Sequence, residues 1–510
     1  MKKVLCIGDT AVDTDHKVTE LARISGTKNH GLVIDIDQDL SKYGYYHTTL
    51  IDLTAGNIIK IVDKFDEVQL LDQPESEWSD SKLFLSSYKL IKEIERQSNK
   101  LAVRVKYGKN INHIDYWTRL FKENKSICLM PWIMVNTESG TGTNLTPCPR
   151  SDTVIKDFKE INDWQTDPDL VSLRNKFKQG KRINKVCDVC YRYEDRGLTG
   201  YRTHDSLDWV AKLGLKSLDD LDNIKNPFVY HLRLSNKCNL MCRMCTPVHS
   251  HLLHEEFQQW PELIGQAQTF DDNYAYSDIN IVDINNLSSK HFLYLTGGEP
   301  TVMKEVYSFM RKCIERGKTD FYFSMTTNGQ NLNPVFMDLA AKFSKLHFSV
   351  SIDGLGKVND YIRWLSDWET LIENCHRLRD QGHIISWNHV PTIWGIHRSH
   401  ELFEFISKEF TDVHLYLQYN RVSLHSAFRS PLVKETIESM KRCQQTAVYY
   451  NDGKDCKSGI DSFLEHYKSY DVDKEHLKKF FAWNDLMDRA RNIKLKDYIP
   501  ELDACREMIQ

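Results

Sequence analysis

The sequence lacks any long apolar run. No stretch of its 510 residues approaches the roughly 18 uninterrupted apolar residues that a membrane-spanning helix needs. The first residues, Met1 to Cys6, begin like a signal peptide, but the apolar run ends at Asp9 and is only as long as one short strand. The chain also lacks a large excess of charge of either sign, because the formal net charge is -4 and no long acidic or basic run occurs. We therefore expect a cytoplasmic protein with no membrane or nucleic-acid partner.

The first part of the chain lacks a phosphate-binding motif. Strand-like apolar runs alternate there with helical stretches, which is an α/β pattern. The predicted strands cover residues 4–8, 32–36, 48–53 and 67–71, and a predicted helix covers 80–96. Neither GxGxxG nor GxxxxGK[ST] follows the first strand. The pattern predicts an N-terminal α/β open-sheet domain at residues 1–105, used for docking or substrate presentation, with a purely structural role as the alternative.

The cysteines are unevenly distributed. Thirteen cysteines are dilute in a chain of this length, which disfavours a disulfide framework. Seven of them fall between Cys128 and Cys245, and such clustering indicates metal binding. The length itself favours about two to four domains. The other cysteines are interpreted as reduced thiols, any of which could donate a hydrogen atom: Cys6, Cys313, Cys375, Cys443, Cys456 and Cys505.

Three cysteines, Cys238, Cys242 and Cys245, have CxxxCxxC spacing directly after the strand-like run 229–234. Three thiolates on one short loop can bind three irons of a cubane 4Fe-4S cluster and leave the fourth iron open to another ligand. Structural zinc is the alternative, but a tetrahedral zinc ion needs four ligands, usually as two separated pairs. The spacing therefore favours an iron-sulfur cluster.

Four upstream cysteines form a second candidate metal site. Cys128, Cys148, Cys187 and Cys190 make a complete set of four thiolates, which suits either an iron-sulfur cluster or zinc. Spacing alone does not decide between the two.

Repeated βα units follow residue 229. The six predicted strands cover residues 229–234, 291–296, 321–327, 346–352, 384–390 and 413–419. Six parallel βα units predict a partial (βα)6 barrel, in which active-site residues lie at the carboxyl ends of the strands. The informative motifs fall at those ends, after the second, third and fourth strands: 296–300 (TGGEP), 325–329 (MTTNG) and 349–354 (SVSIDG).

The order and spacing of these motifs between residues 229 and 419 resemble the radical S-adenosylmethionine (SAM) superfamily. The resemblance implies a reduced cluster that cleaves SAM to methionine and a 5'-deoxyadenosyl radical, which then abstracts a substrate hydrogen. The cofactor-binding residues that it implies are Gly297, Gly298, Glu299, Pro300, Thr327, Asn328, Ser351, Asp353 and Arg363. No catalytic residue beyond these is identified.

Individual roles follow from what SAM needs. Gly297 and Gly298 would let backbone carbonyls approach its amine without an intervening Cβ, and Glu299 would add an acceptor. The planar, always charged fork of Arg363 suits a carboxylate. One departure is Met244, which stands where the family usually has an aromatic residue against the adenine; a thioether can still pack on a purine face.

The upstream cysteines resemble the auxiliary-cluster region called SPASM or twitch, although that region usually follows the barrel. The resemblance implies a second 4Fe-4S cluster, with zinc as the alternative. The predicted domains are then the auxiliary region at 113–205, the radical SAM core at 225–425 and a helical C-terminal region at 426–510, whose tail packs across the barrel or covers its mouth.

The resemblance favours one function and leaves two alternatives. The leading function is a radical SAM enzyme that modifies a peptide or protein and takes electrons from an external reductant such as flavodoxin or ferredoxin. The alternatives are a small-molecule or carbohydrate dehydrogenase and a catalytically inactive, metal-stabilised binding protein.

Overall fold

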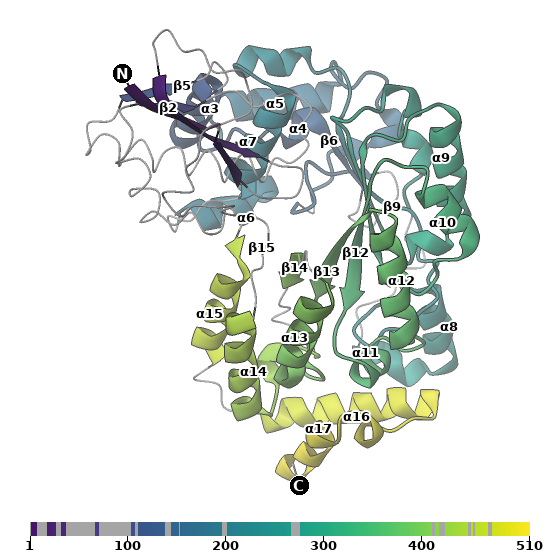
Figure 1. The fold of residues 1–510 in the computed structure, drawn as a ribbon. Helices are drawn as coiled ribbons and strands as arrows, with labels where there is room; N and C mark the ends of the chain where they lie inside the picture. Colours follow the sequence, from purple (N-terminus) through teal and green to yellow (C-terminus); the bar gives the residue numbers. More distant parts are fainter. Residues whose placement is uncertain are drawn as a thin grey trace. The chain divides into compact units, whose positions relative to one another are not determined.

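The structure is a computed structural model of the chain (Figure 1). It describes residues 2–7, 18–26, 32–36, 67–70, 104–107, 111–137, 144–151, 153–195, 201–266, 276–410, 414–417, 424–446, 450–451, 454–467 and 472–509. The chain divides into two compact units, residues 1–133 with 161–227, and residues 134–160 with 228–510. No helix among the described residues combines the length and the apolar character that crossing a membrane requires.

The first unit contains an open, mostly parallel sheet. Its strands are β1 (Lys2–Ile7), β2 (Val18–Gly26), β3 (Leu32–Ile36), β4 (Glu67–Leu70) and β5 (Arg104–Tyr107), in the order β3-β2-β1-β4-β5. Only β3 runs antiparallel to its neighbour. Strands β1, β3 and β4 confirm three of the predicted strands, whereas β2 and β5 were not predicted. The predicted strand at 48–53 and the helix at 80–96 lie outside the described residues.

Helices complete the first unit. They are α3 (Ile111–Glu123), α4 (Met130–Ile133), α5 (Pro168–Lys178), α6 (Asn184–Asp195) and α7 (Tyr201–Leu213). Helix α5 begins at Pro168 because the Asp167 carboxylate accepts hydrogen bonds from the free N–H groups of Asp169 and Leu170. The indole of Trp117 in α3 is fully buried and donates to Leu215 O at 2.8 Å, which fixes α3 on the residues after α7.

A seven-stranded parallel sheet forms the centre of the second unit, in the order β14-β13-β12-β11-β10-β9-β6. The strands are β6 (Met134–Asn136), β9 (Val229–Arg233), β10 (Phe292–Thr296), β11 (Tyr322–Thr327), β12 (Leu346–Ile352), β13 (Ile384–His389) and β14 (His414–Leu417). Strands β9 to β14 confirm the six predicted strands of the barrel. Strand β6 was not predicted and adds a parallel edge beside β9. A short antiparallel pair, β7 (Asn144–Leu145) and β8 (Lys156–Asp157), follows it.

Helices cover one face of this sheet (Figure 1). They are α9 (Lys304–Glu315), α10 (Pro334–Ala340), α12 (Trp368–Asp380) and α13 (Ser399–Glu409). Fully buried Phe323 and Phe348 of the strands pack on Phe309 of α9 and Phe336 of α10. The opposite face carries polar side chains, some buried and others half-buried, which alternate with the apolar ones. We call this the inner face; it includes Tyr294, Tyr322, Ser324, Thr326, His347 and Asn388.

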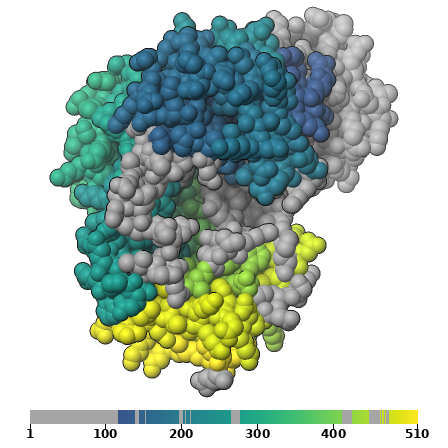
Figure 2. All heavy atoms as spheres, turned by 180° about the vertical axis from the view of Figure 1, so that it is seen from behind, coloured from purple at the N-terminus to yellow at the C-terminus, as the bar shows by residue number. Residues whose placement is uncertain are grey.

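The C-terminal helices lie at the carboxyl-end side of the sheet. They are α14 (Val433–Thr446), α15 (Cys456–Tyr467), α16 (Lys474–Arg491) and α17 (Pro500–Ala504). A two-stranded pair, β15 (Tyr450–Asn451) and β16 (Lys454–Asp455), joins the first two of them. Helix α16 runs beside α8 (His251–Gln259) and α11 (Lys357–Ile362) (Figure 1). In Figure 2 the yellow C-terminal residues lie against the teal segment of the chain. The predicted tail helix is therefore present and packs on the barrel.

Candidate active site

The loop that carries Cys238, Cys242 and Cys245 leaves strand β9 at the carboxyl end of the sheet. We call residues 237–245 the cluster loop. Its backbone is held from two sides, because Met241 N and Arg243 N donate to Trp364 O at 3.0 Å and Ile362 O at 2.7 Å. Cys238 N donates to Nδ1 of His251 at 3.2 Å. These bonds fix the loop before any cofactor binds.

The two glycines after β10 lie against the chain that enters the cluster loop. Gly298 N donates to Ser235 O at 2.7 Å, and Glu299 N donates to Lys237 O at 2.8 Å. A Cβ on Gly298 would lie 2.2 Å from Lys237 O. A Cβ on Gly297, whose φ is +126°, would lie 2.6 Å from Ser235 O. Both glycines are therefore required by a close approach of two backbone segments; their predicted contact with the SAM amine stays a prediction.

Glu299 connects the ends of β10 and β11. Its side chain is 1% exposed and accepts hydrogen bonds from Thr327 Oγ1 at 2.7 Å and Asn328 N at 2.6 Å. Thr301 donates to it through both its backbone N–H and its hydroxyl. Burial raises the pKa of Glu299, and these donors act in the opposite direction. Both carboxylate oxygens of Glu299 thus accept hydrogen bonds from the protein itself. Thr327 is one of these donors, and it holds the Glu299 side chain in place.

Two further predicted residues lie beside the cysteine sulfurs. Asn328 Nδ2 donates to Asn239 Oδ1 at 2.8 Å and lies 4.0 Å from Cys238 Sγ. Arg363 Nη1 lies 3.9 Å from Cys242 Sγ. The residues that directly follow β11 and α11 therefore converge on the cluster loop.

Arg363 is held by a buried carboxylate. Its Nη2 lies 2.7 Å from Oδ2 of Asp353, whose side chain is 0% exposed, and Oδ1 of Asp353 accepts from Val390 N at 3.0 Å. Arg363 Nε is buried and has no hydrogen-bond partner among the described residues. An arginine with one arm paired and another donor unused can take a further acceptor such as a carboxylate.

Pro300 and Ser351 lie differently. Pro300 is buried at the start of a short 3-10 helix, Pro300–Val302, which Glu299 caps. Ser351 lies within β12, 8% exposed, opposite Asn388 of β13. Oδ1 of Asn388 is buried without a partner among the described residues. The structure therefore places Ser351 next to an unused acceptor on the inner face.

The thiols of the cluster loop suit a cluster better than a single ion. Burial raises the pKa of all three, and that of Cys245 reaches about 12, so binding iron as thiolates releases protons. A tetrahedral zinc ion needs four ligands, whereas a cubane cluster can bind three thiolates, each on a separate iron. The three thiols of this loop fit the donor set of such a cluster.

Helix α7 brings together two segments that carry upstream cysteines. Arg202 donates to Ile127 O at 2.6 Å and to the Glu194 carboxylate at 2.7 Å, which places the segment before Cys128 next to α6. Helix α6 carries Cys187 and Cys190 and is kinked at Cys187. Cys148 belongs to the second unit. A metal site formed by all four cysteines stays a prediction.

Sequence reasoning missed several contacts of this site. His251 accepts a bond from the cluster loop, and Arg243, within the CxxxCxxC motif, is 1% exposed. The available signal in the sequence was a charged residue between Cys242 and Met244. Its partners come from α16, as described below.

The fold and the site define a partial parallel α/β barrel with a cysteine loop at the carboxyl ends of its strands. Residues 232–406 match the family model described as "Radical SAM superfamily", so the chain contains a radical SAM domain. That family implies an enzyme that uses a 4Fe-4S cluster and SAM. No curated protein matches the sequence.

Solved structures of low similarity also match. "Native anSMEcpe with bound AdoMet" is 15% identical with a TM-score of 0.30, and the match covers 42% of this chain and 59% of that one. Streptococcus suis SuiB bound to S-adenosylmethionine is 16% identical with a TM-score of 0.28, and the match covers 48% of each chain. SuiB bound to its precursor peptide SuiA is 14% identical, with a TM-score of 0.27 and coverage of 54% and 58%. The chain spans less than two thirds of these structures, and likeness at this level establishes neither substrate nor reaction.

Proposed function

We propose that the chain is a radical SAM enzyme that modifies a peptide or protein. Cys238, Cys242 and Cys245 hold a 4Fe-4S cluster, and the residues around the cluster loop hold SAM. The observation that carries the proposal is the convergence on this loop of Asn328 and Arg363, within 4.0 and 3.9 Å of cysteine sulfurs. When bound and reduced, the cluster supplies the electron that splits SAM into methionine and a 5'-deoxyadenosyl radical, which removes a hydrogen atom from the substrate.

The protein's own residues bind and orient SAM. Arg363, held by Asp353, offers its unused Nε to the SAM carboxylate. Gly297 and Gly298 keep backbone groups close to the cluster loop, and Glu299 fixes the end of β11 that carries Asn328. Met244, packed against a buried apolar cluster, contacts the adenine and helps to exclude water.

The substrate reaches the inner face of the sheet. His347 on this face has hydrogen bonds to Tyr322 Oη at 2.7 Å and to Ser386 Oγ at 2.7 Å. Such hydrogen-bonding groups suit peptide groups. They also suit sugar hydroxyls, so a carbohydrate dehydrogenase is the second candidate. The peptide is preferred because the upstream cysteines resemble the auxiliary region of peptide-modifying enzymes, which rests on analogy.

The upstream cysteines are proposed to hold a second 4Fe-4S cluster, with zinc as the alternative. Burial of Cys128 and Cys190, 8% and 9% exposed, would shield a cluster from solvent. An external one-electron reductant such as flavodoxin or ferredoxin would supply electrons to the enzyme.

The test is anaerobic reconstitution with iron and sulfide, followed by addition of SAM and dithionite. We expect about eight irons per chain, 5'-deoxyadenosine on reduction, and loss of the nucleoside in Cys242→Ala. Cys375→Ala removes a thiol that is buried in α12, away from the cluster loop, and should keep nucleoside release. About four irons would leave the upstream site to zinc. No nucleoside from the intact protein would contradict the enzyme and favour a metal-stabilised binding protein.

A further inference from the structure

A buried arginine lies inside the cysteine motif. Arg243, between Cys242 and Cys245, has a side chain that is 0% exposed. Its Nε donates to Tyr361 O at 2.9 Å, and its guanidinium lies over the Tyr361 ring, 3.7 Å from the centroid. Its Nη2 donates to Oδ1 of Asp488 at 2.5 Å. The positive charge of Arg243 is therefore compensated by the carboxylate of Asp488 in helix α16.

Asp488 has all of its acceptors engaged. Oδ1 also accepts from the Tyr361 hydroxyl at 2.8 Å, and Oδ2 accepts from Leu495 N at 2.7 Å. Asn484, one turn earlier on α16, donates to the Tyr361 hydroxyl at 2.9 Å. One carboxylate thus holds both the cluster loop and Tyr361.

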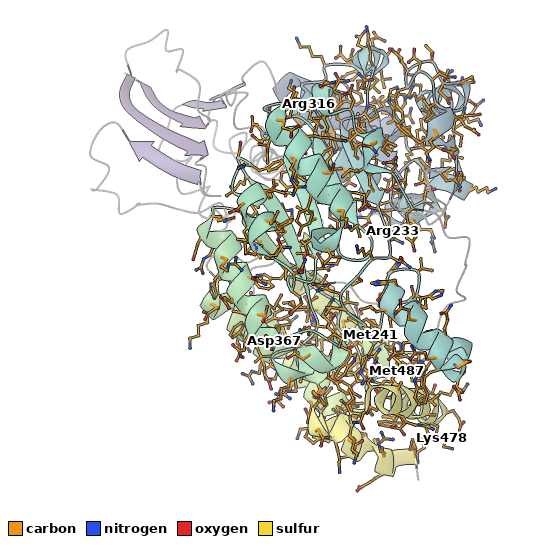
Figure 3. The ribbon with its side chains drawn as sticks, turned by 90° about the vertical axis from the view of Figure 1, so that its right-hand side faces the viewer. Arg233, Met241, Arg316, Asp367, Lys478 and Met487 are labelled. Carbon is orange, nitrogen blue, oxygen red and sulfur yellow. The ribbon has the colours of Figure 1, made fainter. Side chains whose placement is uncertain are left out.

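Tyr361 begins the segment that contacts the cysteines from the other side. Ile362 O and Trp364 O accept the backbone bonds of the cluster loop, and Arg363 between them reaches Cys242. Met241 of the loop and Met487 of α16 lie in the same apolar cluster (Figure 3). Helix α16 therefore contacts both halves of the site through one buried network.

We propose that Asp488 is a positioning residue, which sets the orientation of the cluster loop through Arg243 and Tyr361. The inference rests on the proposed cluster at Cys238, Cys242 and Cys245. A buried ion pair often adds little stability compared with apolar residues of the same shape, but loss of one partner leaves an uncompensated charge. This pair holds the guanidinium, and with it the backbone between two iron ligands, in one orientation.

Asp488 also sets the charge beside the cluster. Without its carboxylate, the Arg243 guanidinium would leave a net positive charge next to Cys242. A positive charge stabilises the reduced cluster, which carries one more electron than the oxidised form. Loss of Asp488 therefore moves the midpoint potential in the positive direction.

The test compares Asp488→Asn with Asp488→Glu and with a control, Glu501→Gln. Glu501 of α17 pairs with His397 at 2.9 Å, so its substitution loosens the C-terminal helices without contact to the cluster loop. The reconstituted full chain is measured for iron content, for the electron paramagnetic resonance spectrum of the reduced cluster with and without SAM, and for midpoint potential.

Asp488→Asn should raise the potential and change the spectral response to SAM, and Glu501→Gln should behave as the unsubstituted protein. Asp488→Glu, which keeps the charge but displaces it, should change the SAM response with a smaller change in potential. Addition of Arg243→Gln to Asp488→Asn removes the excess charge and should return the potential toward its original value. Loss of the cluster in Asp488→Asn alone, with Glu501→Gln loaded, also supports the inference.

An unchanged potential and SAM response in Asp488→Asn would overturn the positioning role. Equal effects of Glu501→Gln would overturn it too, because they would indicate general loosening. Failure of the unsubstituted chain to bind any cluster would instead contradict the proposed function, and with it this inference.

Discussion

Replacement of Gly298 by alanine tests the close approach between the GGEP motif and the cluster loop. The new Cβ would lie 2.2 Å from Lys237 O, which is backbone and cannot rotate away. Real Cβ contacts are essentially never shorter than 3.0 Å, so Lys237 O and the strand end must separate by about 0.8 Å. Cys238 follows Lys237 directly and must move with it.

The magnitude follows from the bonds that this separation breaks. Gly298 N to Ser235 O and Glu299 N to Lys237 O measure 2.7 and 2.8 Å. Each such bond contributes about 0.5–1.5 kcal/mol net, so the variant should lose about 1–3 kcal/mol of unfolding free energy. Urea denaturation followed by tryptophan fluorescence measures the loss. Iron content after reconstitution should fall, because the first cysteine of the loop is displaced.

Gly382→Ala is the matched control. Gly382 has a φ of +84° and no atom within 4 Å of an added Cβ, so alanine there meets backbone strain of about 1–2 kcal/mol and no contact. The control should lose comparable stability and keep its iron. Gly298→Ala with unchanged stability and full iron content would refute the reasoning, and equal loss of iron in both variants would assign the effect to general destabilisation.

Three further predictions concern stability. Burial lowers the pKa of His383 from 6.5 to about 4, so the stability that the neutral imidazole contributes is complete above about pH 6.5 and is lost as the pH falls toward 4. The unfolding free energy of the unsubstituted protein should therefore fall by about 2 kcal/mol between pH 7.5 and pH 5 because of this group. His383→Asn, which keeps an acceptor for Leu346 N, should remove that part of the pH dependence in urea titrations. An unchanged pH dependence would contradict this. Asp353→Asn leaves the charge of Arg363 buried without its partner and should lower the unfolding free energy by about 3–5 kcal/mol. A loss below about 1 kcal/mol would contradict this, because it would mean that the guanidinium is solvated in the variant. Asp167→Ala removes the cap of α5 and should cost about 1 kcal/mol by the same assay, whereas Asp169→Ala, at the second residue of the helix, should cost less.

The core strands were predictable because apolar residues recur at every second position, as in Leu346–Ile352, and polar turns bound each run. Chain order then fixed much of the site, since consecutive parallel strands place their carboxyl ends together. Cys238, Gly298 and Asn328 follow three neighbouring strands, and the structure brings them within one region. The family match at residues 232–406 covers the same segment.

Other features left no readable pattern. Strand β6 has three residues, too few for any periodicity, and its place depends on pairing with β9. The sequence did not reveal why residue 298 must be glycine. A glycine there indicates that some group approaches its Cα closely, but only the structure shows that this group is Lys237 O and not a ligand. The pairing of Arg243 with Asp488 joins positions 245 residues apart, and no local rule predicts such a contact.

That separation has a consequence for synthesis of the protein. The three cysteines leave the ribosome well before Asp488, and domains generally fold in the order in which they emerge. Until α16 has been made, Arg243 has no carboxylate to bind, and the cluster loop lacks one of its supports. Iron insertion is then expected to follow the synthesis of α16. A protein truncated after residue 470 should retain much less iron than the full chain, although all seven clustered cysteines are present in it.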